Sequence, residues 1–106
     1  MDNTQTAWAR IEQAELDIQG VSPGTGFRRS DGLRIRGKIY AINKDDELIL
    51  KLPAERVEDL IATGTGHAWG PGTGRIMREW IAIPGAHHAE WAPLTEEART
   101  FVGVQS

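Results

Sequence analysis

Apolar residues recur at two different spacings along this chain, and each spacing predicts a different kind of element. In segment 4–19 they return every three or four residues, which predicts an amphipathic helix. The same spacing predicts a second helix that begins at Pro53 and ends before Gly64, and a short third helix over 93–102. The apolar positions expected to face the core are Ala7, Trp8, Ile11, Ala14 and Ile18 in the first helix, Val57, Leu60 and Ile61 in the second, and Leu94, Ala98, Phe101 and Val102 in the third.

Between the first two helices the spacing falls to two, which is typical of β-strands with one buried face. In LRIRGKIYAI, residues 33–42, a two-residue turn at Gly37-Lys38 predicts a hairpin. That register would place Arg34 and Arg36 together on the solvent side of the hairpin. The opposite, buried side would carry Leu33, Ile35, Tyr40 and Ile42.

Two further segments are predicted to be strands, LILKL at 48–52 and REWIAI at 78–83. HAW at 67–69 is interpreted as a short strand between two turns, although the spacing alone leaves one or two strands open after the second helix. Because only neighbouring hairpins are available, the sheet is expected to be antiparallel, with the helices packed on one of its faces. The predicted fold class is therefore α+β, with a single antiparallel sheet in one domain that covers residues 1–106.

The composition excludes several kinds of protein. The chain has no cysteine, which removes disulfides, thiolate zinc sites, iron–sulfur clusters and cysteine nucleophiles. Its start is acidic and lacks the apolar centre of a signal peptide, and no apolar run approaches the ~20 residues of a membrane span. We therefore expect a soluble cytoplasmic protein without a membrane partner.

The charge is unevenly distributed along the chain. The net charge is −3, from 15 acidic and 12 basic residues, which argues against a free-standing nucleic-acid binder. Between positions 28 and 38, however, the segment contains five basic residues and a single acidic one, Asp31. This cluster predicts a basic edge that binds an anionic partner, although a solvated sheet face would also be rich in such residues. The candidate contact residues are Arg28, Arg29, Arg34, Arg36 and Lys38, with Arg75 and Arg78 later in the chain.

The glycine-rich segment GTGHAWGPGTGR, residues 64–75, could be mistaken for a phosphate-binding loop. A Walker loop needs a lysine followed by Ser or Thr, and here Arg75-Ile76 follows the glycines. The dinucleotide motif needs a strand before the glycines and a helix after them, and the predicted order is the reverse. The glycines are therefore interpreted as a helix exit and turns between strands. A small-ligand pocket beneath the turn is a further possibility.

No group of residues predicts a catalytic or metal centre. Zinc needs three or four converging ligands, and the adjacent His87 and His88 would point apart, leaving His67 alone. The serines lack a strained nucleophile elbow, and the paired carboxylates fall in a hairpin tip and on a solvated helix face. We therefore predict a non-enzymatic protein with no metal and no cofactor. Among the tryptophans, Trp8 and Trp80 are expected to be buried, and Trp69 and Trp91 partly exposed.

Three segments, in this order, resemble the MmcQ/YjbR family and its relatives in the TfoX N-terminal group: GVSPGTGFRRSDGLRIRGKIYAI, LILKLPAERVEDLIATG and GRIMREWIAI. The resemblance implies an α-β(3)-α-β(2)-α domain of the type also described as CyaY-like or secretion-chaperone-like. Members are commonly described as predicted DNA-binding proteins with a double-wing motif. Carried over to this chain, the wings would be the 36–38 hairpin and the 70–75 turn. The implied phosphate contacts are Arg34, Arg36, Lys38, Arg75 and Arg78.

Two functions are consistent with these observations. The first is nucleic-acid binding, to DNA in the resembling family, through the basic hairpin. The second is a protein-interaction module or homodimer that uses the exposed sheet face, where the partner could also present an acidic surface.

Overall fold

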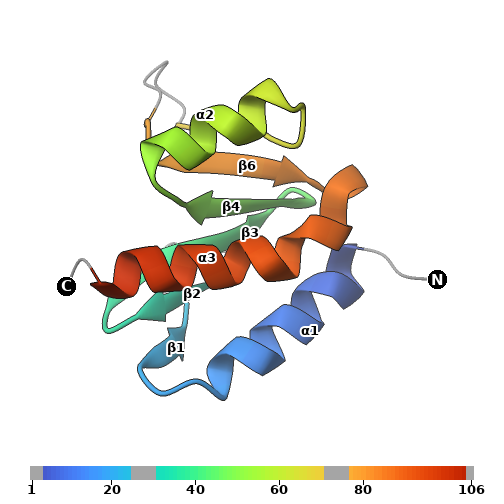
Figure 1. Ribbon diagram of the computed structural model, residues 1–106. Coiled ribbons are helices and arrows are strands. Elements are labelled where there is room, and N and C mark those ends of the chain that lie inside the picture. Colours follow the sequence, from blue (N-terminus) through green and yellow to red (C-terminus); the bar gives the residue numbers. More distant parts are fainter. Residues whose placement is uncertain (1–3, 25–30, 71–76, 105–106) are drawn as a thin grey trace.

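A computed structural model of the protein describes residues 4–24, 31–70 and 77–104 (Figure 1). The predicted contact residues Arg28, Arg29 and Arg75 lie outside the described residues, as do positions 71–75 of the glycine-rich turn. The elements, in chain order, are α1 (Thr4–Leu16), β1 (Val21–Pro23), β2 (Asp31–Ile35), β3 (Lys38–Lys44), β4 (Glu47–Lys51), α2 (Ala54–Ala62), β5 (His67–Ala68), β6 (Trp80–Pro84), the 3₁₀ helix η1 (Gly85–Glu90) and α3 (Trp91–Val104).

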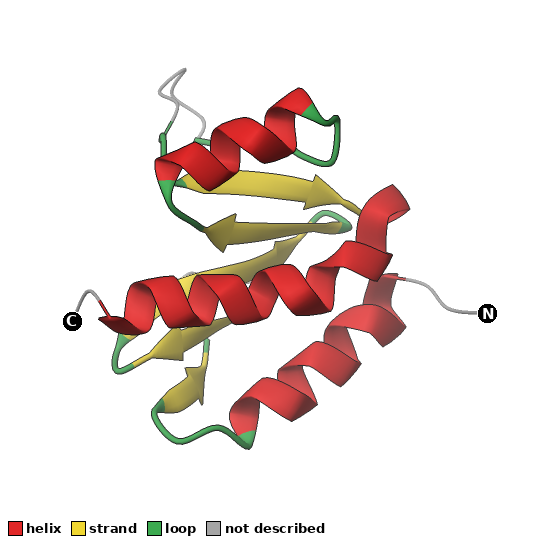
Figure 2. Cartoon of the chain, viewed as in Figure 1, coloured by secondary structure: helices red, strands yellow, loops and turns green. Residues whose placement is uncertain are grey.

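The strands of the described residues form one antiparallel sheet in the order β1-β2-β3-β4-β6-β5. The three α-helices pack against one face of this sheet. In Figure 2, α3 crosses in front of the strands, with α2 above it and α1 below it. The predicted α+β class with helices on one face of a single antiparallel sheet is confirmed. The short strand β1 was not predicted, because Pro23 and the glycines around it are typical of a turn; it pairs with β2 at the edge of the sheet.

The core between helices and sheet follows most of the predicted apolar stripes, with one exception in α2 and two in α1. In α2, Ile61 was predicted to face the core but is 42% exposed, because only the other two members of that stripe point inward. The helix α1 ends at Leu16, three residues before the predicted end, and Ala14 is exposed. The inward position one residue later is taken by a carboxylate, because Glu15 is 7% exposed. An apolar pattern cannot identify such a position, since the helix stripe is recognised only by its apolar members.

The hairpin between β2 and β3 turns at Arg36 and Gly37, one residue earlier than predicted. Their φ angles of +52° and +86° are both positive, which is the type I′ geometry that matches the twist of antiparallel strands. A non-glycine residue in this conformation costs about 1 kcal/mol, and the strand pairing on both sides offsets that cost. The predicted Gly37-Lys38 turn is therefore wrong.

A bulge in the same hairpin changes which residues share a face. Arg34 pairs with Ile39 and Leu33 pairs with Ala41, so Tyr40 is an extra residue on β3. Tyr40 and Ala41 both lie in the core beneath the helices. Beyond the bulge the alternation is reversed, so Ile42 lies on the other face, and its predicted position beside Tyr40 is wrong.

The exit from α2 confirms the structural interpretation of the first glycines. Gly64 has a φ of +77°, and its N–H donates to the Ile61 carbonyl at 3.1 Å. The N–H of Thr65 donates to the Leu60 carbonyl at 2.9 Å, which completes a Schellman motif. The chain then enters β5 at His67, as predicted.

Two tryptophans differ from the predicted burial. Trp91 is fully buried, and its indole N–H donates to the Ile83 carbonyl of β6 at 3.1 Å. Trp80 is only half-buried, on the face of the sheet away from the helices. The alternation of β6 places Ile81 and Ile83 under the helices, so its tryptophan must face the opposite way.

Candidate functional site

The face of the sheet opposite the three α-helices, here called the helix-free face, carries a second apolar cluster. Its centre is formed by Ile42, Ile49 and Ala82, which are at most 4% exposed. Three partly buried side chains pack against this centre: Ile39, Trp69 and Trp80. The exposed surface of the face therefore comes from the aromatic and polar groups around the aliphatic centre.

An aromatic pair and a lysine lie together on this face. The Trp69 and Trp80 ring centroids are 5.6 Å apart, with a tilt of 53° between the planes. In the pairing of β4 with β6, Lys51 is directly opposite Trp80, so the two side chains project from the same face. Lys51 was not among the predicted contacts, although its alternation with Leu50 and Leu52 in LILKL could have indicated its side.

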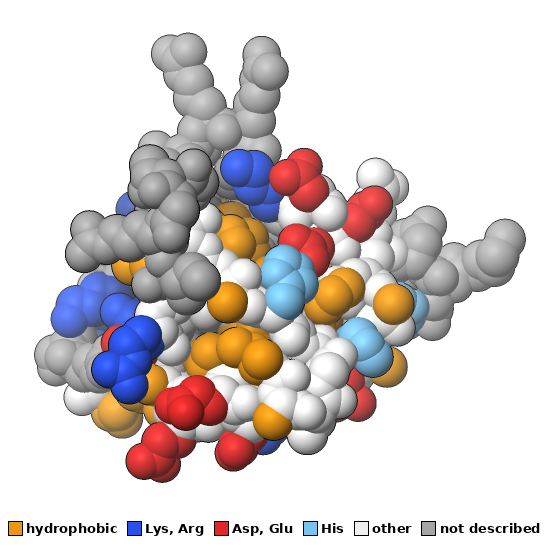
Figure 3. Space-filling view, turned by 90° about the horizontal axis from the view of Figure 1, so that it is seen from above, with side chains coloured by type: hydrophobic (Ala, Val, Ile, Leu, Met, Phe, Trp, Pro, Cys, Tyr) orange, Lys and Arg blue, Asp and Glu red, His pale blue; other side chains and the backbone are white. Residues whose placement is uncertain are grey.

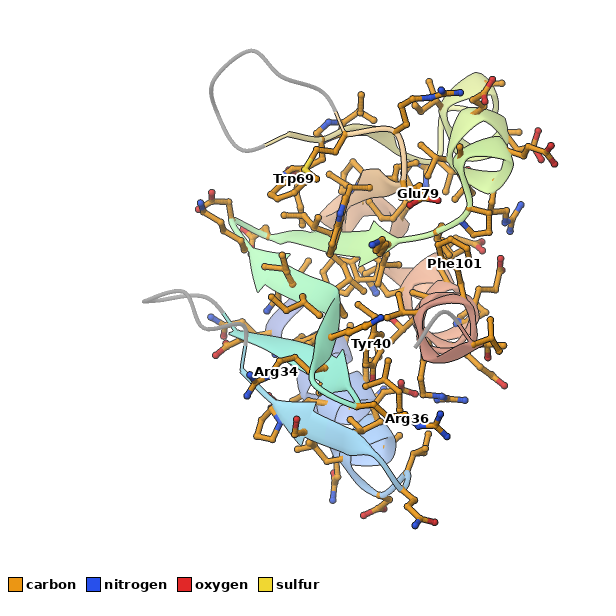
Figure 4. All side chains as sticks on the ribbon, turned by 90° about the vertical axis from the view of Figure 1, so that its left-hand side faces the viewer. Arg34, Arg36, Tyr40, Trp69, Glu79 and Phe101 are labelled. Carbon is orange, nitrogen blue, oxygen red and sulfur yellow. The ribbon has the colours of Figure 1, made fainter. Side chains whose placement is uncertain are left out.

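Arg34 also projects from the helix-free face. Its Nη2 donates to the Pro23 carbonyl at 3.3 Å, and its Nε is buried without a hydrogen-bond partner in the described part of the chain. In Figure 4, Arg34 and Trp69 lie on the side of the sheet away from α3. A guanidinium and an aromatic surface thus share one face, at opposite ends of the sheet order.

Arg36 does not share this face with Arg34, so the predicted pairing of the two arginines is wrong. Because Arg36 occupies the turn itself, its side chain leaves the strand alternation and lines a hollow with Arg99 and Gly103 of α3. Figure 4 shows it on the α3 side of the sheet.

The other described members of the predicted set also lie apart. Lys38 is exposed at the start of β3, next to the turn. Arg78 lines a hollow beside α2 with Met77 and Ile61. Among the described residues the structure therefore does not bring the predicted basic side chains together as one wing. Figure 3 shows basic, acidic and apolar side chains interspersed on the face seen from above, rather than one patch of a single sign.

A buried polar cluster, which the sequence did not suggest, joins three elements beneath the sheet. The Tyr40 hydroxyl donates to Glu15 Oε1 at 2.7 Å, and Arg99 Nη1 donates to Glu15 Oε2 at 2.6 Å. Burial, together with the Glu15 carboxylate, raises the pKa of Tyr40 far above its ordinary range. Both oxygens of Glu15 are engaged by protein groups, so this cluster is structural and leaves no free acid for chemistry.

The histidines do not assemble a metal centre. Among the described residues no three histidine, cysteine or carboxylate side chains come together as a metal site requires. His67 instead pairs with Glu47, with 2.5 Å between Nε2 and Oε2, and this contact ties the edge strand β5 to β4 across β6. The hydrogen bond to the carboxylate raises the pKa of His67, against the opposing effect of its partial burial.

We expect His67→Ala to destabilise the protein by a few tenths of a kcal/mol at about pH 5.5 and not measurably at about pH 8.5. The folded protein binds the His67 proton more tightly than the unfolded chain does. This contribution is therefore present below the ordinary histidine pKa and is lost as the pH rises through the higher folded value. Urea unfolding at both pH values measures it. In a Glu47→Gln background the difference between the two pH values should disappear; if it persists, the ion pair is not its cause.

Comparison of the chain with protein-family models, with curated proteins and with solved structures finds no match in any of the three. The resemblance to the MmcQ/YjbR family therefore stays an expectation that rests on its motifs. Within the described ranges no helix combines the length and the apolar character needed to cross a membrane.

Proposed function

We propose that this domain is a non-enzymatic nucleic-acid-binding module that holds a single strand across the helix-free face. The observation that carries the proposal is the position of Lys51 directly opposite Trp80, with Trp69 packed against the same ring. Proteins that bind single strands combine aromatic rings, on which bases stack, with cations that follow the phosphates. Arg34 supplies a second cation on the same face.

The surplus of acids lies on the helical side, whereas Glu47, which shares the helix-free face with Lys51, is paired with His67. The carboxylates of Glu55, Asp59, Glu96 and Glu97 all line the region between α2 and α3, on the other side of the sheet. A phosphate backbone is repelled there, so an approaching strand is directed to the helix-free face. This surface replaces the hairpin wing of the sequence prediction, because Arg36 lies on the helical side.

Self-association, or binding of an acidic protein, is the alternative use of the same face. Its aliphatic centre is already buried within one chain, so a partner would contact chiefly Ile39, Trp69 and Trp80. Three partly buried side chains give less apolar area than stable interfaces bury. Sedimentation of the protein alone tests self-association, which nucleic-acid binding by this face does not require.

The proposal predicts binding of a fluorescent oligothymidine of about 20 nucleotides, measured by anisotropy at about 50 mM salt. Trp69→Leu, which keeps apolar packing but removes the stacking ring, should weaken binding about 10-fold. Lys51→Ala should lower the slope of log affinity against log salt by about 0.7, as expected for one lost phosphate contact. Both variants should melt within a few degrees of the parent protein, and a thermal unfolding measurement checks this before binding is measured.

Arg36→Ala is the matched control, because this arginine lies on the helical side of the sheet. It should leave the affinity and the salt slope unchanged. If Arg36→Ala lost as much affinity as Lys51→Ala, the nucleic-acid contact would have to be assigned to the hairpin tip and not to the helix-free face. No binding of the oligonucleotide at low salt would reject the proposed function altogether.

A further inference from the structure

An open groove of about 740 Å³ lies between α2 and α3, on the side of the molecule away from the helix-free face. It exists because the two helices rest on different parts of the sheet: α2 packs over β5 and β6, and α3 packs over β2, β3 and β4. The two helices run in opposite directions across the sheet (Figure 1). The residues that line it are Pro53, Glu55, Arg56, Asp59, Pro93, Glu96, Glu97, Thr100 and Phe101.

The floor of the groove is apolar. Phe101 is partly buried and packs against the main core, with its remaining surface directed into the groove. Pro53, just before α2, and Pro93, in the first turn of α3, add two rigid apolar rings to the lining. An apolar surface of this kind between two helices accepts a large apolar side chain from a partner.

The rim of the groove is acidic. Four carboxylates and one guanidinium line it, a surplus of three negative charges. Arg56 of α2 bridges the helices by a bidentate pair with Glu97 of α3, at 2.9 Å and 3.2 Å, and so neutralises one carboxylate. Glu96 makes only a long ion pair with Arg99, at 4.0 Å, and its side chain is 70% exposed. Glu55 and Asp59 are also exposed, so all three carboxylates can accept a cation from a partner.

We propose that this groove docks a basic amphipathic segment of a partner protein. A Leu- or Phe-type side chain of the segment packs on Phe101, and Lys or Arg side chains beside it pair with Glu55, Asp59 and Glu96. Charge complementarity selects this occupant, because the acidic rim repels phosphate and anionic lipid and attracts lysine and arginine side chains. The inference is independent of the proposed function, because the two surfaces lie on opposite sides of the sheet.

Three labelled peptides of about 15 residues test the docking. The first has leucines at helical spacing flanked by lysines, the second has glutamates in place of the lysines, and the third has serines in place of the leucines. We expect the first to bind with a dissociation constant of order 10 µM, and the other two at least about 10-fold more weakly. Absence of binding by the first peptide up to about 1 mM overturns the proposal.

Charge-reversal variants then locate the binding. Glu55→Lys and Glu96→Lys, at exposed positions of α2 and α3, should each lower the affinity for the first peptide about 10-fold. Asp17→Lys makes the same charge change at an exposed position outside the groove, and its effect should stay within about twofold. An equal loss in Asp17→Lys overturns the proposal, because net charge alone would then explain the binding.

The two proposals fail separately. Lys51→Ala and Trp69→Leu should leave peptide binding unchanged, and Glu55→Lys should not weaken binding of the oligonucleotide. Amide chemical shifts that change at Thr100 and Phe101 on addition of the first peptide would place it in the groove. Shifts confined to β4 and β6 would place the peptide on the helix-free face and overturn the docking assignment.

Discussion

Replacing Glu15 with Ala is expected to lower the free energy of unfolding by about 3–5 kcal/mol. The variant removes the carboxylate that accepts from both Tyr40 and Arg99. The Arg99 side chain is only 18% exposed, so its charge would lose its close partner with little water to replace it. The Tyr40 hydroxyl, which is fully buried, would lose its acceptor as well. Equilibrium unfolding in urea measures the difference directly.

Two further variants separate the charge from the hydrogen bond. Tyr40→Phe removes only the hydroxyl and should cost about 1 kcal/mol. Replacing all three members by apolar residues, as Glu15→Leu with Tyr40→Phe and Arg99→Met, should recover much of the stability lost in Glu15→Ala, because no charge is then left unpaired. Gln13→Ala, at an exposed position on the same helix, should change little. A loss below about 1 kcal/mol in Glu15→Ala would mean that solvent or rearrangement compensates the cluster.

Gly66→Ala is expected to destabilise the protein by about 3 kcal/mol, although it adds a single methyl group. A Cβ at this position would lie 2.8 Å from Cδ1 of both Ile81 and Ile83 and 2.9 Å from the Ala82 carbonyl oxygen. The isoleucines belong to the main core, and the carbonyl belongs to the backbone of β6. The chain between α2 and β5 therefore cannot keep its position if the residue carries a side chain.

Gly64→Ala is the control for this second variant, because a Cβ there meets nothing within 4 Å. Its positive φ alone should cost about 1 kcal/mol. The contact with Ile81 can be tested further by a double-mutant cycle, in which Ile81→Val should destabilise the parent protein but recover part of the loss in Gly66→Ala. Additive effects, or equal losses at Gly64 and Gly66, would show that the close approach is not the reason for the glycine.

The two sides of the protein differ in their balance of charge, which the net charge of −3 conceals. Lys51 and Arg34 project from the helix-free face, while the surplus carboxylates line the groove between α2 and α3. A sum over the chain cannot separate them, because the alternation of each strand sends neighbouring residues to opposite sides of the sheet. The two proposed partners, a nucleic-acid strand and a basic peptide, accordingly approach from opposite sides.

The sequence by itself determined the class of the fold, the position of most elements and the role of the first glycines. These features depend on neighbouring residues: apolar spacing defines the helices and strands, and Pro53 and Gly64 define the limits of α2. The apolar spacing could not give the hairpin register. The turn starts one residue early, and the one-residue bulge at Tyr40 then shifts the pairing of β2 with β3 again. The early turn takes Arg36 out of the strand alternation and away from Arg34, so the predicted basic wing does not form.

Only the tertiary structure decided which side chains meet across elements. Glu15 is an ordinary polar residue in a helix until Tyr40 and Arg99 converge on it from β3 and α3. Lys51 becomes part of the candidate surface only because β6 places Trp80 opposite it. In both cases the interaction depends on residues that are far apart in sequence and meet only in the folded protein. Local sequence patterns therefore cannot predict it.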